Sequence, residues 1–152
     1  MASEIEHKYL VADDGWRKMA VSALELTQGY LCRDVERVVR VRLAVENGGE
    51  GRGFITIKGR TVGVTRLEME YEIPADDARQ LLALCVGPIV SKTRHIVPFG
   101  GHRWELDEFH GRHEGLVLAE IELPTADTHY DLPLWVGSDV TGDPRYYNSN
   151  LE

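Results

Sequence analysis

Cysteine is scarce in this sequence: only Cys32 and Cys85 are present, and they stand alone. Neither belongs to a Cys-X-X-Cys pair or to a cluster with histidine, so the sequence gives no sign of a disulfide framework or a structural zinc site. Its first residues, MASEIEHK, carry charge at once and lack the apolar core of a signal peptide. These features are typical of a reducing compartment, and we expect the protein to be cytoplasmic.

Long apolar runs and an excess of positive charge are missing as well. The longest uncharged run covers residues 81–91, which is too short to cross a membrane and contains Gly87-Pro88. The formal net charge is −8, whereas a nonspecific nucleic-acid binder needs a dominant basic surface. The sequence therefore favours neither a membrane nor a nucleic acid as partner. It also lacks the GxxxxGK[ST] phosphate loop and the GxSxG nucleophile turn.

Alternation of polar and apolar residues, the period of a β-strand, dominates what is present. With 152 residues the chain is expected to form one domain, spanning 1–152. So many strands with few helices indicate a mainly antiparallel sheet or barrel. The predicted strands are 3–12, 23–32, 37–46, 53–59, 65–74, 89–98, 103–109 and 116–123.

Helical signals are few. Asp76 is the expected N-cap of a helix over residues 76–86, and a shorter helix is expected near 15–21. A further helix within 125–137 would be limited by the proline in that stretch. Gly100-Gly101 lies between two strand patterns and predicts a tight hairpin.

Charged side chains occupy one face of nearly every predicted strand. In SEIEHKYLV, residues 3–11, Glu4, Glu6 and Lys8 alternate with apolar or aromatic neighbours and so share one face. Ordinary solvated sheet faces mix charges with Ser, Thr, Asn and Gln, but these faces are almost wholly ionic. Elsewhere the basic residues in phase are Arg40, Arg42, Lys58, Arg66, Lys92 and Arg94. The acidic residues in phase are Glu68, Glu70, Glu72, Glu105, Asp107, Glu120 and Glu122.

Two arrangements have this pattern. An antiparallel sheet with one solvated face is its usual meaning. Alternatively, the charged faces turn inward around a cavity, and the apolar faces point outward and are covered by helices. Alternation does not separate the two, because an open sheet and a barrel have the same period.

Converging faces would have a specific chemistry. Guanidinium and ammonium groups in such number form a dense anion site. A single phosphate does not need so many cations, whereas a linear chain of several phosphates does. Carboxylates repel phosphate, so their presence is explained by a divalent metal such as Mg²⁺ or Mn²⁺, which bridges carboxylates to substrate phosphates. Such a site polarises phosphoryl oxygens and positions water, and it requires no nucleophilic side chain.

The EIEHK segment fits an ExExK motif, and with it the chain resembles the CYTH superfamily, also called triphosphate tunnel metalloenzymes. The resemblance rests on an ordered set of segments along the chain and implies a mainly β fold. That fold is an eight-stranded antiparallel barrel whose charged faces point into a tunnel, with a few covering helices. The segments are QGYL at 28–31, VRVRL at 39–43, TIKG at 56–59, EYEIP at 70–74, KTR at 92–94, WELDEF at 104–109, AEIELP at 119–124 and VTGDPRYYNSNL at 140–151.

The resemblance also implies roles for individual residues. The metal ligands would be Glu4, Glu6, Glu120 and Glu122. The phosphate-binding residues, which are also the expected catalytic residues, would be Lys8, Arg40, Arg42, Lys58, Lys92 and Arg94. Arg66 is a further candidate for substrate binding, and Arg145 matches a basic residue near the tunnel mouth. Additional tunnel acids, with less defined roles, would be Glu70, Glu72 and Asp107.

The implied function is hydrolysis of a small triphosphate, most directly tripolyphosphate to pyrophosphate and phosphate, with Mg²⁺ or Mn²⁺ as cofactor. Alternatives are a class IV-type adenylate cyclase, a thiamine or nucleoside triphosphatase, and a noncatalytic polyphosphate- or nucleotide-binding module. The sequence leaves open whether the protein forms a homodimer. Related chains often continue past the position of Glu152 into a C-terminal helix at one tunnel end, so access and substrate length at that end stay open too.

Overall fold

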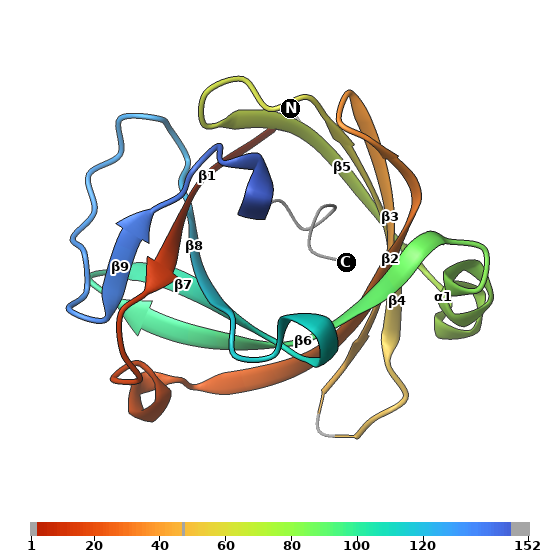
Figure 1. Ribbon diagram of the computed structural model, residues 1–152, viewed down its shortest axis with the longest axis horizontal. Helices are drawn as coiled ribbons and strands as arrows, with labels where there is room; N and C mark the ends of the chain where they lie inside the picture. The colour runs from red at the N-terminus through yellow and green to blue at the C-terminus, as the bar shows by residue number, and fades with distance from the viewer. Residues whose placement is uncertain (1–2, 47, 147–152) are drawn as a thin grey trace.

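The computed structural model describes residues 3–46 and 48–146, with side chains from Ile5 onward. Within these ranges the chain is mostly β-strand, with one α-helix and three short 3-10 helices (Figure 1). The strands are β1 Ser3–Val11, β2 Ser22–Asp34, β3 Arg37–Val45, β4 Arg52–Gly59, β5 Thr65–Ile73, β6 Val86–Phe99, β7 His102–Phe109, β8 Val117–Glu122 and β9 Val136–Asp139. The helices are α1 Ala75–Leu82, η1 Arg17–Met19, η2 Gly111–His113 and η3 Pro144–Tyr146.

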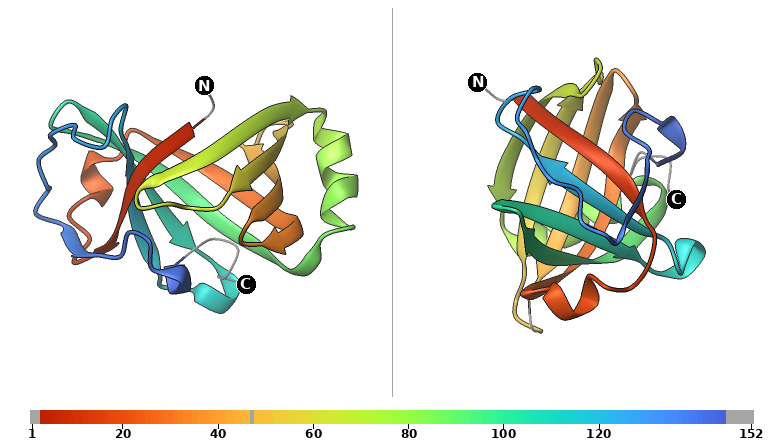
Figure 2. Two further views of the ribbon diagram at one scale, coloured as in Figure 1. Left: turned by 90° about the horizontal axis from the view of Figure 1, so that it is seen from above. Right: turned by 90° about the vertical axis from the view of Figure 1, so that its left-hand side faces the viewer.

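Eight of the strands close into an antiparallel barrel in the order β5-β4-β3-β2-β6-β7-β8-β1 (Figures 1 and 2). Strand β1 closes it by pairing with β5 near its start, where Ser3 lies opposite Leu67, and with β8 over Glu6 to Leu10. The predicted barrel is confirmed, as is each of its eight predicted strands. Strand β9, which was not predicted, pairs with the end of β1 outside this closed ring.

The main apolar core lies on the outer face of β1, β6, β7 and β8. Trp104 and Ile121 are completely buried there, on the opposite faces of their strands from the charged residues. Trp16 and Trp135 cover them, and the Trp104 and Trp135 rings meet edge to face at 5.6 Å. The expectation that helices cover the outer faces is wrong on this flank, because irregular segments before η1 and β9 carry both tryptophans.

Helix α1 covers a second part of the outer wall, against β2, β3 and β4 (Figure 2). Gly53 allows this close contact, because a Cβ at that position would lie 2.7 Å from Cβ of Ala78. The helix begins one residue earlier than predicted, with Pro74 as N-cap, so the prediction of Asp76 as N-cap is wrong. It ends at Leu82 rather than Val86, because Val86 already belongs to β6.

The other two helix predictions fail in different ways. The stretch 15–21 contains only the three-residue η1, Arg17–Met19. Residues 125–137 form no helix; they run as turns and irregular chain until β9 begins at Val136. The proline in this stretch disfavours a helix, and β1 offers a strand edge with which Val136 pairs instead.

The Gly100-Gly101 hairpin is confirmed. It joins β6 to β7 directly after the Phe99–His102 pair. Both glycines have positive φ, +60° and +79°, which a two-residue turn that matches the strand twist requires. The turn fixes the register that brings the charged residues of β6 and β7 opposite one another.

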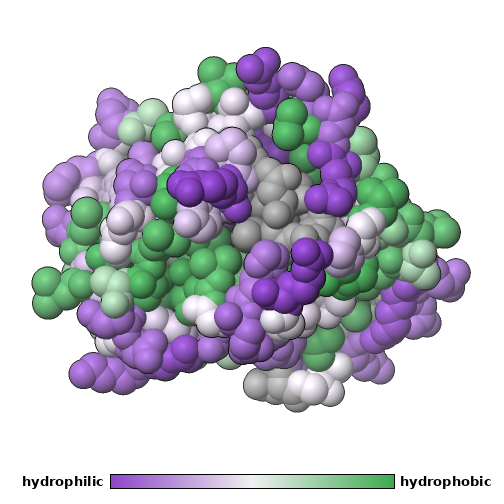
Figure 3. Space-filling view, viewed as in Figure 1, coloured by the Kyte–Doolittle hydropathy of each residue, from purple (hydrophilic) through white to green (hydrophobic). Residues whose placement is uncertain are grey.

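Part of the outer wall stays exposed and apolar. Side chains of Ile57, Leu67, Met69 and Tyr71, on β4 and β5, are exposed. Figure 3 shows hydrophobic surface on both flanks of this view, interspersed with hydrophilic groups. None of the helices within the described ranges has the length and apolar character needed to span a bilayer.

Candidate active site

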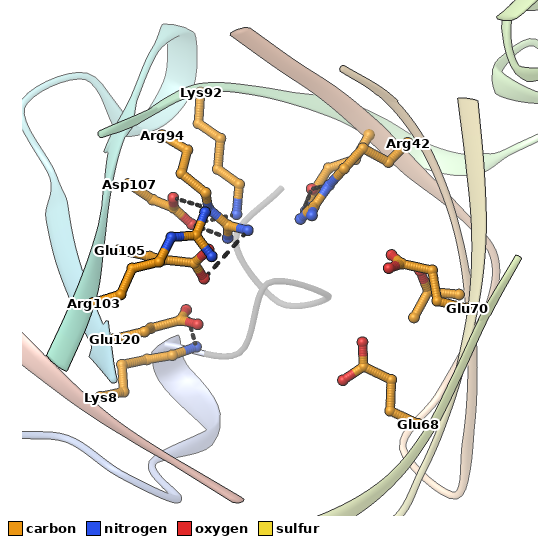
Figure 4. A network of polar contacts seen from close by, with 12 residues as sticks. Lys8, Arg42, Glu68, Glu70, Lys92, Arg94, Arg103, Glu105, Asp107 and Glu120 are labelled. Atoms are coloured by element: carbon orange, nitrogen blue, oxygen red, sulfur yellow. Dashed lines mark hydrogen bonds and ion pairs between the residues drawn. The ribbon is translucent and has the colours of Figure 1, made fainter. Parts of the chain in front are cut away.

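The charged faces of the strands turn inward and enclose a cavity of about 230 Å³. Figure 4 shows side chains from opposite walls pointing into this common space. The interpretation as an open sheet with a solvated ionic face is therefore wrong. The acidic residues that line the cavity are Glu6, Glu68, Glu70, Glu105, Glu120 and Glu122. The basic ones are Lys8, Arg40, Arg42, Lys58, Arg66 and Arg94.

Strand register decides which charges meet. In an antiparallel pair, residues directly opposite each other share a face. On β1 and β8, Lys8 lies opposite Glu120. On β6 and β7, Arg94 lies opposite Asp107. The barrel thus places bases and acids together within one wall, although they lie far apart in the sequence.

Asp107 lies beneath the cavity lining and contacts two cations, Lys92 and Arg94. Its Oδ2 accepts hydrogen bonds from Lys92 Nζ at 2.6 Å and from Arg94 Nη2 at 2.9 Å, and its Oδ1 accepts one from Arg94 Nε at 2.8 Å (Figure 4). Burial alone would raise the pKa of Asp107, but Arg94 and Lys92 outweigh burial and hold it well below its usual range. Burial lowers the pKa of Lys92 to about 7, and the nearby Arg94 adds to this while Asp107 opposes it.

Lys8 and Glu120 form the next ion pair along this wall, with Lys8 Nζ 3.5 Å from Glu120 Oε1. Lys8 Nζ also donates a hydrogen bond to the carbonyl oxygen of Tyr146 at 2.9 Å, which ties η3 to the barrel. Burial opposes charge on both groups. Their mutual attraction outweighs it, raising the pKa of Lys8 and lowering the pKa of Glu120 to about 2. Glu120 is therefore a carboxylate at any physiological pH.

The opposite wall carries Arg40. Its Nη2 donates to Thr56 Oγ1 at 3.0 Å and lies 3.5 Å from Glu70 Oε1. Its Nε is buried and has no hydrogen-bond partner among the residues that the structure describes. A buried donor without an acceptor is costly, so this N–H fits a site that receives an anion. Lys58 and Glu68 lie beside it, with Nζ 3.9 Å from Oε2.

The acidic residues offer a place for a divalent cation. Within the described part of the chain, no three acidic, histidine or cysteine side chains are already grouped as ligands, and the Glu4 side chain lies outside that part. Glu6 and Glu122, however, line the cavity directly opposite each other on β1 and β8. Facing carboxylates repel each other, and Mg²⁺ is commonly held by one or two carboxylates together with substrate phosphates. The two carboxylates therefore fit the role of protein ligands to a cation whose remaining ligands would include substrate oxygens.

Several predicted site residues lie away from the cavity. Glu72 is exposed and accepts hydrogen bonds from Arg52 at 2.6 and 3.1 Å. Arg145 is exposed and pairs with Asp143 at 2.7 Å, so it does not line the cavity in this structure. Lys92 and Asp107 lie behind the lining and act on it through Arg94.

Other residues in the site were not selected from the sequence. Glu105 belongs to the alternating pattern but was given no role, and it lines the cavity with its carboxylate 3.6 Å from Arg94 Nη1. Tyr30 lines the cavity and Gln28 lies completely buried beside it. Their position on the inner face of β2 was available from the strand period, but neither is charged, and the selection followed charge.

Together these features define an antiparallel barrel protein whose interior is built to hold a polyanion. The chain belongs to the CYTH domain family, whose model matches residues 2–147. It is 45% identical over 152 residues to a protein of Acetivibrio thermocellus named inorganic triphosphatase, covering 99% of this chain and 94% of that one. A Nitrosomonas europaea protein of the same name is 35% identical over 155 residues, covering 98% and 96%.

Solved structures agree with this assignment. The crystal structure of an inorganic triphosphatase matches with a TM-score of 0.66 and 32% identity, covering 99% of this chain and 95% of that chain. A Pyrococcus horikoshii protein matches with a TM-score of 0.62 and 28% identity, covering 82% and 80%. The barrel is therefore shared well beyond the two sequence relatives.

Proposed function

We propose that this protein hydrolyses triphosphate compounds and that inorganic tripolyphosphate, cleaved to pyrophosphate and phosphate, is its preferred substrate. The observation that carries the proposal is the set of cations on opposite walls of one small cavity, which suits an anion longer than a single phosphate. Two relatives named inorganic triphosphatase, each aligned over almost the whole chain, support the same activity.

The basic residues would bind and orient the phosphate chain. Arg40, Arg42 and Arg94 present guanidinium groups from both walls, and such groups match phosphoryl oxygens in a bidentate manner. Phosphoryl transfer depends mainly on positioning and on stabilising charge on these oxygens. The buried Asp107 holds Arg94 in place, so the wall keeps its geometry as the substrate changes charge.

The acidic residues would hold a divalent metal, Mg²⁺ or Mn²⁺. Glu6 and Glu122 are the candidate ligands on the facing strands, with Glu4 and Glu120 as neighbours on the same strands. Lys8 keeps Glu120 ionised and limits its rotation. When bound, such an ion polarises a phosphoryl oxygen and activates water.

Preference for an inorganic substrate follows from the composition of the lining. Among the described residues that line the cavity, Tyr30 is the only aromatic one, and its ring is almost completely buried in the wall. A nucleobase or a thiamine ring is usually held by exposed aromatic or apolar surface. We therefore expect ATP and thiamine triphosphate to be poorer substrates than tripolyphosphate.

A phosphate-release panel tests the proposal. Tripolyphosphate, ATP, thiamine triphosphate and pyrophosphate are each incubated with the protein, with Mg²⁺, with Mn²⁺ and with EDTA. The expected result is metal-dependent release of phosphate from tripolyphosphate, little from pyrophosphate, and no cyclic AMP from ATP. Cyclic AMP as the main product would favour the cyclase, and binding without turnover of any substrate would favour the noncatalytic module.

A further inference from the structure

Arg42 differs from the other buried cations of the site in the charge of its partner. Lys92 and Arg94 contact Asp107, and Lys8 contacts Glu120. Arg42 instead donates two hydrogen bonds to the neutral amide oxygen of Gln28, from Nε at 2.9 Å and from Nη2 at 2.7 Å. Within the described residues Arg42 forms no ion pair, and the carboxylate of Asp107 acts on its charge only from beyond contact distance.

Gln28 is held firmly in this position. It is completely buried on β2 and lies directly opposite Arg42 on β3. Its amide nitrogen donates toward the hydroxyl of Tyr30 at 3.4 Å, which leaves the amide oxygen for Arg42. The two bonds use the Nε edge of the guanidinium, so Nη1 and the second Nη2 hydrogen are not used by Gln28.

The Gln28 amide oxygen accepts hydrogen bonds from Nε and Nη2 of Arg42 without neutralising the charge of the guanidinium. Burial lowers the pKa of Arg42, and the nearby Arg40 and Arg94 lower it further, while Asp107 partly opposes this shift. The three guanidinium groups therefore repel one another. An anion placed between them relieves that repulsion. A glutamate at position 28 would relieve it too, but would then compete with the anion for the same charge.

We propose that Gln28 is a positioning residue that orients the Arg42 guanidinium toward the phosphoryl oxygens of the substrate while leaving its charge available to them. The proposal deepens the proposed function and rests on it for the identity of the substrate.

Two substitutions separate this role from a purely structural one. Gln28→Glu keeps the shape of the side chain and adds a carboxylate opposite Arg42. Gln28→Met keeps approximate size and removes both hydrogen-bonding groups. The matched control is Ser91→Glu, which adds the same charge at an exposed position on β6, the strand that pairs with β2. Each variant is compared with the wild type by melting temperature with and without tripolyphosphate in EDTA, and by kcat and KM with Mg²⁺.

The expected result for Gln28→Glu is a melting temperature without ligand at or above that of the wild type, because a buried ion pair forms. Its affinity for tripolyphosphate should fall by roughly tenfold or more, with KM rising more than kcat falls. Gln28→Met should also raise KM by roughly tenfold, because Arg42 loses its orientation. Ser91→Glu should bind and turn over tripolyphosphate like the wild type.

Wild-type affinity and KM in both Gln28 variants would overturn the proposal, because a structural role alone leaves them unchanged. If Gln28→Glu does not fold, Gln28→Met decides by the same KM criterion. A wild-type protein that binds tripolyphosphate but does not hydrolyse it would refute the proposed function, whereas the binding comparison in EDTA would still test Gln28.

Discussion

Asp107 is the residue on which two buried cations of the site depend. It is almost completely buried and accepts hydrogen bonds from both Lys92 and Arg94. Burying an ion pair brings little net stability, but removing one partner leaves the others as uncompensated charges. The residue therefore serves stability and substrate binding together, since the orientation of Arg94 depends on it.

Replacing Asp107 by asparagine should destabilise the protein by about 3–5 kcal/mol, because Lys92 and Arg94 lose the carboxylate that both of them contact. Urea denaturation at neutral pH measures this loss in the free energy of unfolding. Asp143→Asn, which removes the carboxylate of an exposed pair with Arg145, is the control and should change little. Equal stability of both variants would contradict a special role for Asp107.

Acid should lower the free energy of unfolding by protonating Glu120. Its folded pKa of about 2 lies below the unfolded value, so between about pH 4 and pH 2 the unfolded state binds more protons than the folded state. The stabilisation that Glu120 contributes is therefore complete above about pH 4 and is lost as pH falls through about 2.

Denaturation curves in EDTA, recorded from about pH 5 down to about pH 2, measure this effect. The range begins above the unfolded pKa of Glu120, roughly 4, and ends at its folded pKa of about 2. Glu120→Gln should flatten the dependence of the unfolding free energy on pH in this range. A variant with the same slope as the wild type would show that Glu120 is not held ionised by Lys8.

The two facing carboxylates are tested by conservative substitution. Glu6→Gln and Glu122→Gln should each lower the metal-dependent kcat by roughly 10²-fold or more and weaken Mg²⁺ dependence, because each removes a candidate ligand. The measurement is phosphate release from tripolyphosphate over a range of Mg²⁺ concentrations. Glu36→Gln, in an exposed pair with Arg60, is the control. Unchanged Mg²⁺ titrations in both cavity variants would remove these residues from the metal site.

Among single residues, the sequence identified those site residues that are charged. The in-phase Lys, Arg, Glu and Asp residues identified most of the lining, since a period of two assigns whole faces at once. It did not identify Gln28, whose importance depends on lying opposite Arg42. Nor could it show that Arg145 would turn to Asp143 rather than to the cavity, because that choice depends on the local turn at η3.

Strands and their register carry most of the architecture, and they were the most predictable elements. Long alternating segments such as TRLEMEYEI, residues 65–73, determine strand and face together. The short β9, with the sequence VGSD, has too few residues to show a period and becomes a strand only by pairing with β1. Which irregular segments would cover the tryptophan core was equally unpredictable, because tertiary packing determines it.

The contact of α1 with the barrel is testable at Gly53. Gly53→Ala places a Cβ 2.7 Å from Ala78 Cβ and 3.0 Å from two backbone oxygens, so helix or strand must shift. We expect a loss of about 1–3 kcal/mol in unfolding free energy, measured by denaturation in urea. Gly59→Ala on the same strand is the control, since its Cβ would meet Leu67 at an ordinary 3.4 Å. Equal stabilities would mean that α1 does not pack tightly on β4.

At the scale of the whole molecule, charged side chains of both signs are brought together around one interior cavity. A net charge of −8 describes the chain as a whole, yet the barrel gathers Lys and Arg side chains around one interior cavity. Net charge therefore argues against a dominant basic outer surface but not against an anion site in the interior. The closed ring of strands is what makes this possible, because it gives the sheet an inside on which charges from distant segments meet.

Melting temperature as a function of tripolyphosphate concentration, in EDTA, tests most directly whether this interior binds a condensed phosphate. A ligand that binds only the folded state stabilises it by about 2.7 kcal/mol at one hundred times its dissociation constant. We predict a rise that grows with tripolyphosphate, exceeds that produced by orthophosphate at equal concentration, and shrinks in Arg40→Met. A melting temperature that tripolyphosphate leaves unchanged would show that the cavity does not bind a condensed phosphate.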